Sequence, residues 1–168
     1  QVFRHGKRAS RVVKMRSKDT GDERWIDLRS APIFERPGKV KLAVNIFRDI
    51  TGSIERQREL NRYAAIVASS NDAIVGETLD GKITSWNPAA EKLYGHTQDE
   101  AIGQHISFIF PPRIKSRELE LLNRIHAGET IEHYETKRQH KDGQSIDILL
   151  TISPIYTSDG TLTGYSTN

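Results

Sequence analysis

The chain of 168 residues contains no cysteine. This absence excludes disulfide bridges, thiolate metal sites, iron–sulfur clusters and cysteine nucleophiles. It gives no support to an oxidising compartment, and we expect a cytoplasmic protein. Long apolar runs are also absent: the longest, Ala64 to Ala68, is far shorter than the ~20 residues that cross a bilayer. We therefore expect no membrane contact in this segment.

Glycine and proline are scarce, at 12 and 6 residues, and 36% of the residues are hydrophobic, which indicates a folded globular chain. The charge is uneven, because residues 1–62 carry 16 Lys and Arg against 8 Asp and Glu, whereas residues 63–168 carry 9 against 14. A basic segment can contact nucleic acid. Here Arg11, Lys14 and Arg16 alternate with apolar residues, and no aromatic side chains separate them. This pattern favours the solvent-exposed face of a strand over a nucleic-acid partner.

An internal repeat divides the chain. Ala31-Pro32-Ile33-Phe34 recurs 122 positions later as Ser153-Pro154-Ile155-Tyr156, and Ile26 and Leu28 correspond to Ile148 and Leu150 at the same offset. We predict the C-terminal half of one module over residues 1–51, a linker helix over 52–70, and a second module over 63–168 that lacks only its last few residues. The segment is expected to come from a longer tandem array.

The sequence of the linker predicts a helix, because no proline or glycine occurs from Ser53 to Ser70. Thr51 or Ser53 is the expected cap, with Glu55 in the first turn. An apolar stripe recurs at helical spacing, formed by Leu60, Tyr63, Ala64 and Val67. Two interpretations stay open: a connector docked on one module, or a dimerising signalling helix.

The second module predicts an α+β fold with one covered sheet. A hairpin over 73–86 precedes a helix that Asn87 caps and Gly95 ends, and Thr97 with Glu100 forms a capping box for a short second helix. A longer helix is expected over 112–127. Three strands follow, over 130–140, 144–156 and 161–168, the middle one presenting Ile146, Ile148, Leu150 and Ile152 on one face.

In the first copy, the strands are expected to turn one apolar face toward a helical layer that these residues do not supply. That face would carry Ile26, Leu28, Val40, Leu42 and Val44. Because such a face is too large to leave wet, we expect it to be covered by a neighbouring chain or by residues of a longer protein.

The second module resembles a PAS domain. The residues that carry the resemblance, in order, are Asn71-Asp72-Ala73-Ile74-Val75, Leu79-Asp80-Gly81-Lys82-Ile83, Trp86-Asn87-Pro88-Ala89-Ala90-Glu91, Tyr94-Gly95, Ile102-Gly103-Gln104 and Lys141-Asp142-Gly143. Residues 1–51 resemble the C-terminal half of another PAS domain. The resemblance implies a five-stranded antiparallel sheet in the order 2-1-5-4-3 with short helices on one face, and a sensory or dimerising role.

The same resemblance implies a signal relay at Asp49-Ile50-Thr51, which closes the first copy. In the family a carboxylate and a hydroxyl at this motif tie the sheet to the output helix, and we carry these roles over to Asp49 and Thr51 alone. Plain helix capping is the alternative interpretation.

PAS cofactors find little support in this chain. Flavin sensing through a cysteine adduct is excluded, because there is no cysteine. The haem ligand of the family falls at about residues 117–118, which hold no histidine, and His126 lies at the last turn of that helix. PAS domains that bind flavin without a covalent bond often have a tryptophan at the position where this chain has Ile131-Glu132, so the resemblance does not support a flavin here. His126, His133 and His140 are spaced by seven and predict no metal site.

A pocket between the sheet and the long helix is the candidate ligand site. Its predicted lining comprises Trp86, Phe108, Leu122, Ile125, Tyr134, Ile148 and Leu150. Any ligand would be small and mostly apolar; alternatively, these side chains simply fill the core. The sequence offers no set of catalytic residues, so we expect no enzyme activity from this segment.

We therefore expect a sensory and interaction module of a multidomain signalling protein, a histidine kinase or a cyclic-dinucleotide enzyme, that forms a homodimer or contacts a neighbouring PAS module. Alternatives are a ligand-free dimerisation spacer and the PAS region of a transcriptional regulator.

Overall fold

A computed structural model describes residues 7–112, 121, 124–125 and 129–168. The helix expected over 112–127, with Leu122 and His126, therefore lies largely outside the described residues. The chain divides into two compact units, residues 1–63 and 64–168, with helix α2 (Thr51–Ser69) running through the division.

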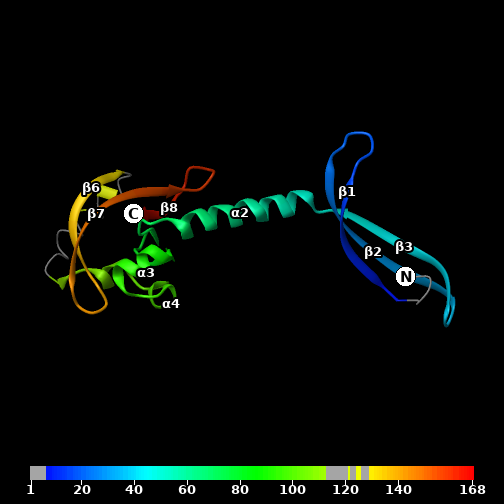
Figure 1. The fold of residues 1–168 in the computed structure, drawn as a ribbon, viewed down its shortest axis with the longest axis horizontal. Coiled ribbons are helices and arrows are strands. Elements are labelled where there is room, and N and C mark those ends of the chain that lie inside the picture. Colours follow the sequence, from blue (N-terminus) through cyan, green and yellow to red (C-terminus); the bar gives the residue numbers. More distant parts are fainter. Residues whose placement is uncertain (1–6, 113–120, 122–123, 126–128) are drawn as a thin grey trace. The chain divides into compact units, whose positions relative to one another are not determined.

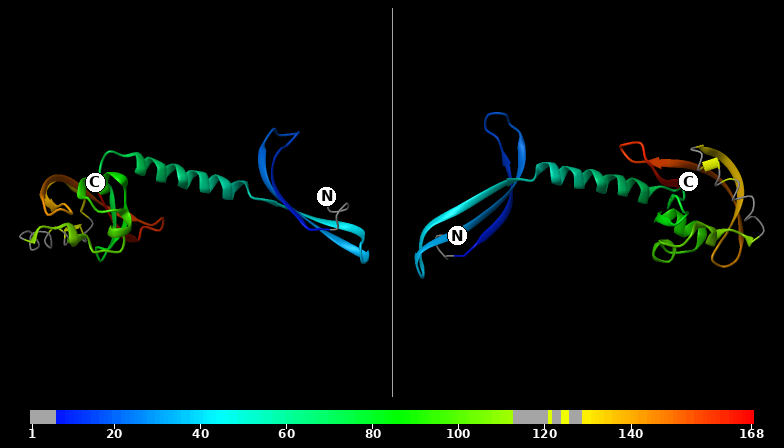
Figure 2. Two further views of the ribbon diagram at one scale, coloured as in Figure 1. Left: turned by 60° about the horizontal axis from the view of Figure 1, so that its bottom comes forward. Right: turned by 180° about the vertical axis from the view of Figure 1, so that it is seen from behind.

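The first unit is a three-stranded antiparallel sheet in the order β1-β2-β3 (Figures 1 and 2). The strands are β1 (Ala9–Arg16), β2 (Glu23–Arg36) and β3 (Lys39–Asp49). Gly38 forms the tight turn between β2 and β3 with a φ of 81°, a left-handed conformation that glycine adopts without steric cost.

The expected single apolar face of this sheet is wrong. The register pairs Leu28 with Phe47, whereas Ile33 pairs with Leu42 and Ala31 with Val44. Residues directly opposite share a face and successive residues alternate, so Ile26 and Leu28 lie on the other face from Leu42 and Val44. Both faces thus carry apolar side chains, with Val44 45% and Phe47 64% exposed. The sequence shows which residues of one strand share a face, but it does not show how neighbouring strands pair.

Helix α2 begins directly after β3, with only Ile50 between them. The Thr51 hydroxyl does not cap the helix. The Asp49 carboxylate does, because its Oδ1 accepts a hydrogen bond from the Thr51 amide at 2.9 Å. The helix starts two residues earlier than Ser53, so Glu55 falls outside its first turn, which contains no acidic residue. No residue of α2 is buried.

The second unit contains a five-stranded antiparallel sheet in the order β5-β4-β8-β7-β6, which confirms the predicted order 2-1-5-4-3. Its strands are β4 (Val75–Thr78), β5 (Ile83–Trp86), β6 (Ile131–Gln139), β7 (Ser145–Tyr156) and β8 (Leu162–Thr167). Gly164 lets β8 approach β4, since a Cβ there would lie 2.1 Å from the Glu77 carbonyl oxygen. Figure 1 shows helices α3 (Pro88–Tyr94) and α4 (Gln98–Ala101) on one side of this sheet.

Local signals set the ends of these helices as predicted. The Asn87 Oδ1 caps α3 by accepting from the Ala90 amide at 2.9 Å, and Gly95 ends the helix at a φ of 76°. Thr97 and Glu100 form the expected capping box of α4. A short 3-10 helix, η1 (Ile106–Ile109), was not anticipated from the sequence.

Asn87 also joins four parts of the second unit while it is 4% exposed. Its Oδ1 accepts a second bond from the Ile74 amide at 2.9 Å. Its amide nitrogen donates to the carbonyls of Val67 and Asp72, at 3.2 and 2.9 Å. A buried amide with four hydrogen bonds fixes the entry of the chain into β4 against the start of α3.

Two apolar clusters form the core of the second unit. One joins β4, β5, α3, α4 and η1, and the other lies under β6, β7 and β8. The predicted inward face of β7 is confirmed, because Ile146 and Ile148 pack against these clusters while Leu150 and Ile152 are buried in one of them. Every buried apolar side chain among the described residues belongs to this unit.

Candidate functional site

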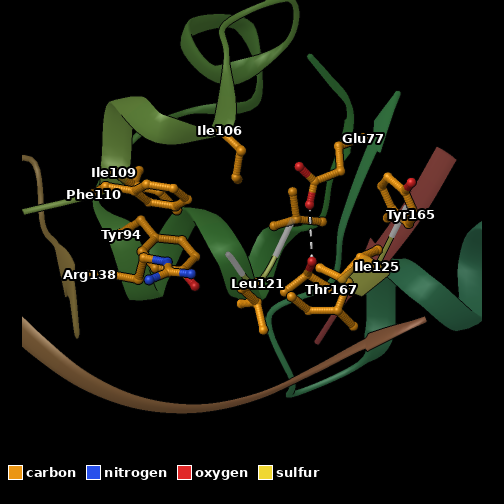
Figure 3. A pocket seen from close by; sticks show the side chains of 12 residues that line it. Glu77, Tyr94, Ile106, Ile109, Phe110, Leu121, Ile125, Arg138, Tyr165 and Thr167 are labelled. Atoms are coloured by element: carbon orange, nitrogen blue, oxygen red, sulfur yellow. Dashed lines mark hydrogen bonds between the residues drawn. The ribbon is translucent and has the colours of Figure 1, made fainter. Parts of the chain in front are cut away.

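The second unit encloses a cavity of about 30 Å³ between its sheet and helices (Figure 3). Most of its wall is apolar, but five polar or aromatic-hydroxyl side chains reach it. The lining residues are Val75, Glu77, Tyr94, Ile106, Ile109, Phe110, Leu121, Ile125, Arg138, Ile152, Tyr165 and Thr167. A cavity of this size holds roughly one or two water-sized groups.

Glu77 is the acidic residue of this wall. It lies on β4, two residues after Val75, and is only 6% exposed. Its Oε1 accepts a hydrogen bond from the Thr167 hydroxyl at 3.1 Å, drawn as a dashed line in Figure 3. Its Oε2 is fully buried and has no hydrogen-bond partner among the described residues. Burial raises the pKa of Glu77 to about 7, against the opposing effects of the Thr167 bond and the charge of Arg138.

Arg138 lies on β6 and is 4% exposed. Its guanidinium stacks 4.3 Å from the centre of the Phe110 ring. One of its nitrogens donates to the Thr136 hydroxyl at 3.2 Å and to the Lys137 carbonyl at 3.0 Å. In Figure 3, Arg138, Tyr94 and Phe110 gather on one side of the cavity, while Glu77, Thr167 and Tyr165 gather on the other. The wall therefore carries a cation and an acid at separate places.

The structure distributes the predicted pocket residues over several places. Ile125 lines the cavity. Trp86 packs instead in the first apolar cluster, 5.2 Å from Tyr94 and 6.2 Å from Phe108 between ring centres. Ile148 and Leu150 line a more open groove of about 430 Å³. Tyr134 packs against the second cluster, and Leu122 lies outside the described residues.

Sequence reasoning missed the polar side of the cavity. Strand alternation places Glu77 on the same face as Val75, so a charged residue at an inward position of β4 was a readable signal. Arg138 lies four residues after Tyr134, a predicted pocket residue, and the two share a face of β6, so its inward position was also readable. The bulge between Ile131 and Tyr134 shifts the alternation by one residue, so alternation counted from Ile131 alone gives the opposite face.

The predicted relay residues meet at the joint between β3 and α2. The Trp25 amide of β2 donates to the Thr51 hydroxyl at 2.8 Å, and the Ile50 amide donates to the Trp25 carbonyl at 2.8 Å. Asp49 accepts from the Thr51 amide and, through Oδ2, from Arg24 at 3.2 Å. The hydrogen bonds of Thr51 and the charge of Arg24 lower the pKa of the Asp49 carboxyl. The first turn of α2 is thus hydrogen-bonded to the sheet at two points, both on Thr51, and the other two bonds hold the chain just before the helix.

The described residues offer neither a metal site nor a large cofactor site in the enclosed cavity. No group of three or more histidine or acidic side chains suited to a metal occurs in the described part of the chain. The enclosed cavity of about 30 Å³ is also roughly tenfold smaller than the sites of drug-sized ligands. Within the described ranges, no helix is long and apolar enough to cross a membrane.

Two parts of the chain match known protein families. Residues 61–167 match the family described as the PAS fold, and residues 1–52 match a family described as a PAS domain. The chain belongs to the PAS family. It comprises PAS sequence on both sides of α2, which agrees with the internal repeat and confirms the tandem resemblance.

Curated relatives of this PAS chain are signalling proteins. It is 27% identical over 134 residues to a phytochrome of Mougeotia scalaris, covering 71% of this chain and 12% of that protein. It is 27% identical over 145 residues to the probable diguanylate cyclase DgcE of Escherichia coli, covering 79% of this chain and 12% of that protein. The biofilm dispersion protein BdlA of Pseudomonas aeruginosa is 24% identical, covering 82% and 33%. The chain therefore spans a third or less of the length of these relatives.

Solved structures show the same fold. A PAS domain from Colwellia psychrerythraea matches with a TM-score of 0.60 and 27% identity, covering 65% of this chain and 92% of that one. A structure titled as an RNA-binding light-oxygen-voltage receptor matches with a TM-score of 0.53 and 11% identity, covering 99% and 78%. At 11% identity this second match shows the fold alone. Together, the relatives and the family identify a sensory signalling module in general terms.

Proposed function

We propose that the chain is a sensory relay module, in which the state of a PAS sheet is passed to helix α2 through the joint at Asp49 and Thr51. The observation that supports this is the bond from the Trp25 amide to the Thr51 hydroxyl, at 2.8 Å. Trp25 lies on β2, so a neighbouring strand holds the first helical residue directly. Any shift between β2 and β3 therefore has to break this bond or carry the start of α2 with it.

Arg58 adds a second contact between the helix and the sheet of the first unit. Its guanidinium lies 5.5 Å from the centre of the Trp25 ring. Trp25 thus contacts the helix at Thr51 with its backbone and at Arg58 with its side chain, two turns apart. Two contacts at different heights oppose rotation of α2 as well as its translation, which suits a helix that transmits a defined movement.

The test compares Thr51→Val and Asp49→Ala with Ser53→Ala, a matched control in the same turn. Thr51→Val should speed hydrogen exchange at the Trp25 amide by roughly five- to tenfold, since a hydrogen bond contributes about 1 kcal/mol. Asp49→Ala should speed exchange in the first turn of α2, and both variants should alter the output of the whole signalling protein. Unchanged output from Asp49→Ala at normal stability would refute the relay.

The whole protein is proposed to carry an output domain, either a histidine kinase or a cyclic-dinucleotide enzyme. The similarity to DgcE favours the second of these. The present segment is proposed to lack catalytic activity of its own and to act in the cytoplasm. A PAS region of a transcriptional regulator is the alternative, and salt-dependent binding of DNA by residues 1–62 would favour it.

Self-association through α2 is a second candidate function, because its apolar stripe is exposed. Leu60 is 62%, Tyr63 57% and Val67 39% exposed, at the spacing of three and four residues that forms a helix-pairing seam. Leu60→Glu should convert a homodimer to a monomer in analytical ultracentrifugation. Ala65→Glu changes the charge equally on the opposite side of α2 and should leave the dimer intact. A monomer in all three proteins would refute this function.

A further inference from the structure

The buried Oε2 of Glu77 marks a binding point inside the cavity. A carboxyl oxygen that is removed from water without a hydrogen bond destabilises a protein, and it does so more strongly when it is charged. Glu77 is 6% exposed, and its Oε2 has no partner among the described residues, while the other oxygen is held by Thr167. One half of the carboxyl group is therefore fixed and the other half faces the cavity.

The size and charge of the cavity select what this oxygen can bind. A volume of about 30 Å³ admits one or two atoms of the size of a water oxygen. A further cation is disfavoured, because Arg138 already contributes a buried positive charge to the wall. A carboxylate is disfavoured by Glu77 itself. A neutral hydroxyl group, which donates one hydrogen bond and occupies little volume, meets both limits.

We propose that the cavity is a binding site for a neutral hydroxyl group that donates a hydrogen bond to Oε2 of Glu77. The hydroxyl belongs either to an internal water molecule or to the tip of a small organic ligand, of which only one or two atoms enter the cavity. This inference rests on the proposed sensory function and names the chemistry that its cavity recognises. It also replaces the mostly apolar ligand expected from the sequence with one that carries a donor group at its tip.

The site is connected to β8, the strand of the second unit that corresponds to β3 of the first unit. Thr167, which binds Oε1, lies near the end of β8, and the 122-residue offset aligns Thr167 with Asn45 of β3. β3 is the strand that leads into α2. A hydroxyl bound at Oε2 thus acts on the same carboxyl group that holds β8, which gives ligand binding a route to the sheet.

Protonation of Glu77 reverses the direction of this hydrogen bond. A protonated Oε2 donates and the oxygen of the bound hydroxyl accepts, so the site should stay occupied while the donor and the acceptor exchange roles as the pH drops below the pKa of about 7. Among the described residues, the titratable or charged side chains that reach the cavity around Glu77 are Arg138 from β6, Tyr165 from β8 and Tyr94 from α3. Burial raises the pKa of the Tyr94 and Tyr165 hydroxyls above the ordinary value of about 10, so neither tyrosine changes charge between pH 5 and 8.

The experiment compares the wild-type chain with Glu77→Met and Thr167→Val. Glu77→Met removes the acceptor with a side chain of similar length, and Thr167→Val removes the partner of Oε1 but leaves Oε2. Water-to-protein cross-relaxation by nuclear magnetic resonance at pH 8 detects a bound water, and mass spectrometry of the natively purified chain after denaturation detects a retained organic ligand. We expect one of these signals in the wild type and in Thr167→Val, and its loss in Glu77→Met.

Three results would overturn the inference. They are the absence of both signals in the wild type, a signal that persists in Glu77→Met, and a retained compound without a hydroxyl group. A high-resolution crystal structure of the wild type checks the first result independently of any variant. These outcomes leave the relay untouched, because that proposal is read at the first turn of α2 and in the output of the whole protein.

Discussion

The same half of a PAS sheet occurs twice in this chain, with different surroundings. Leu28 in β2 and Leu150 in β7 occupy corresponding positions of the repeat. Leu150 is 3% exposed under the helical layer of the second unit, whereas Leu28 is only partly buried. The strands form in both units, but among the described residues only the second unit buries an apolar core.

The comparison separates two contributions to the fold. Hydrogen bonds between strands and the glycine turns produce the same ladder in both units. The core, the enclosed cavity and the buried charges of Glu77 and Arg138 require the helices that pack on the second sheet. Sheet formation is thus encoded within the repeat, whereas the core and the buried polar groups depend on the helices that cover the sheet.

The largest expected effect comes from shortening one isoleucine to alanine in each unit. Ile83 of β5 is 2% exposed and Ile46 of β3 is 60% exposed. Ile83→Ala should lower the free energy of unfolding of the second unit by about 2–5 kcal/mol, through lost transfer energy and a cavity. Ile46→Ala should change that of the first unit by less than about 0.5 kcal/mol.

Hydrogen exchange of peptides from β2 and β4 reports the two units separately. A cost for Ile46→Ala as large as that for Ile83→Ala would break the comparison. It would show that a partner chain covers β3 in solution.

The next effect concerns pH and should appear in the second unit. Because the pKa of Glu77 is raised to about 7 from 4.5, the unfolded chain loses this proton first as the pH rises. Stability should therefore fall between about pH 4.5 and 7 and stay low above, by about 3 kcal/mol at 1.4 kcal/mol per pKa unit. Glu77→Gln should abolish this fall.

Urea unfolding followed by Trp86 fluorescence in a Trp25→Phe background measures this effect. Burial lowers the pKa of His96 and acts in the opposite direction below about pH 6.5, so the difference between Glu77→Gln and its parent isolates Glu77. The same pH dependence in both proteins would contradict the assignment.

A smaller effect is expected at Asn87, which distinguishes the second unit by joining β4 to α3. Asn87→Ala removes the cap of α3 and leaves the Ile74 amide without its acceptor, so we expect a loss of about 2 kcal/mol. The exposed Asn71, changed to alanine, is the matched control and should be near neutral. Equal effects of the two changes would show that the buried network does not support the unit.

Much of the fold could be predicted from local residues. Asn87, Gly95 and the Thr97–Glu100 box set the ends of two helices, because capping depends on atoms within four residues of each other. The alternation in β7 correctly gave its inward face. The face of the first sheet was wrong, since strand pairing there depends on a register that neither strand specifies alone.

The candidate site was predictable only in part. The joint residues Asp49 and Thr51 were found through the resemblance to PAS domains, whose motif they match, and the structure brings both into contact at the start of α2. The cavity lies in the predicted unit, but of the predicted pocket residues that the structure describes, only Ile125 lines it. Trp86 packs in the neighbouring cluster because its indole nitrogen donates to the His96 carbonyl at 3.0 Å, which fixes the ring there.

The sequence by itself determined the repeat, the strands, the turns, the helix caps and membership of the PAS family, because each rests on residues close together in the chain or on a pattern that recurs. Only the tertiary structure decided which faces meet and which polar groups are enclosed. Glu77 and Thr167 are 90 residues apart and form one hydrogen bond. The pKa of Glu77 and the chemistry of its cavity follow from that packing, since desolvation depends on all the atoms that surround a charge.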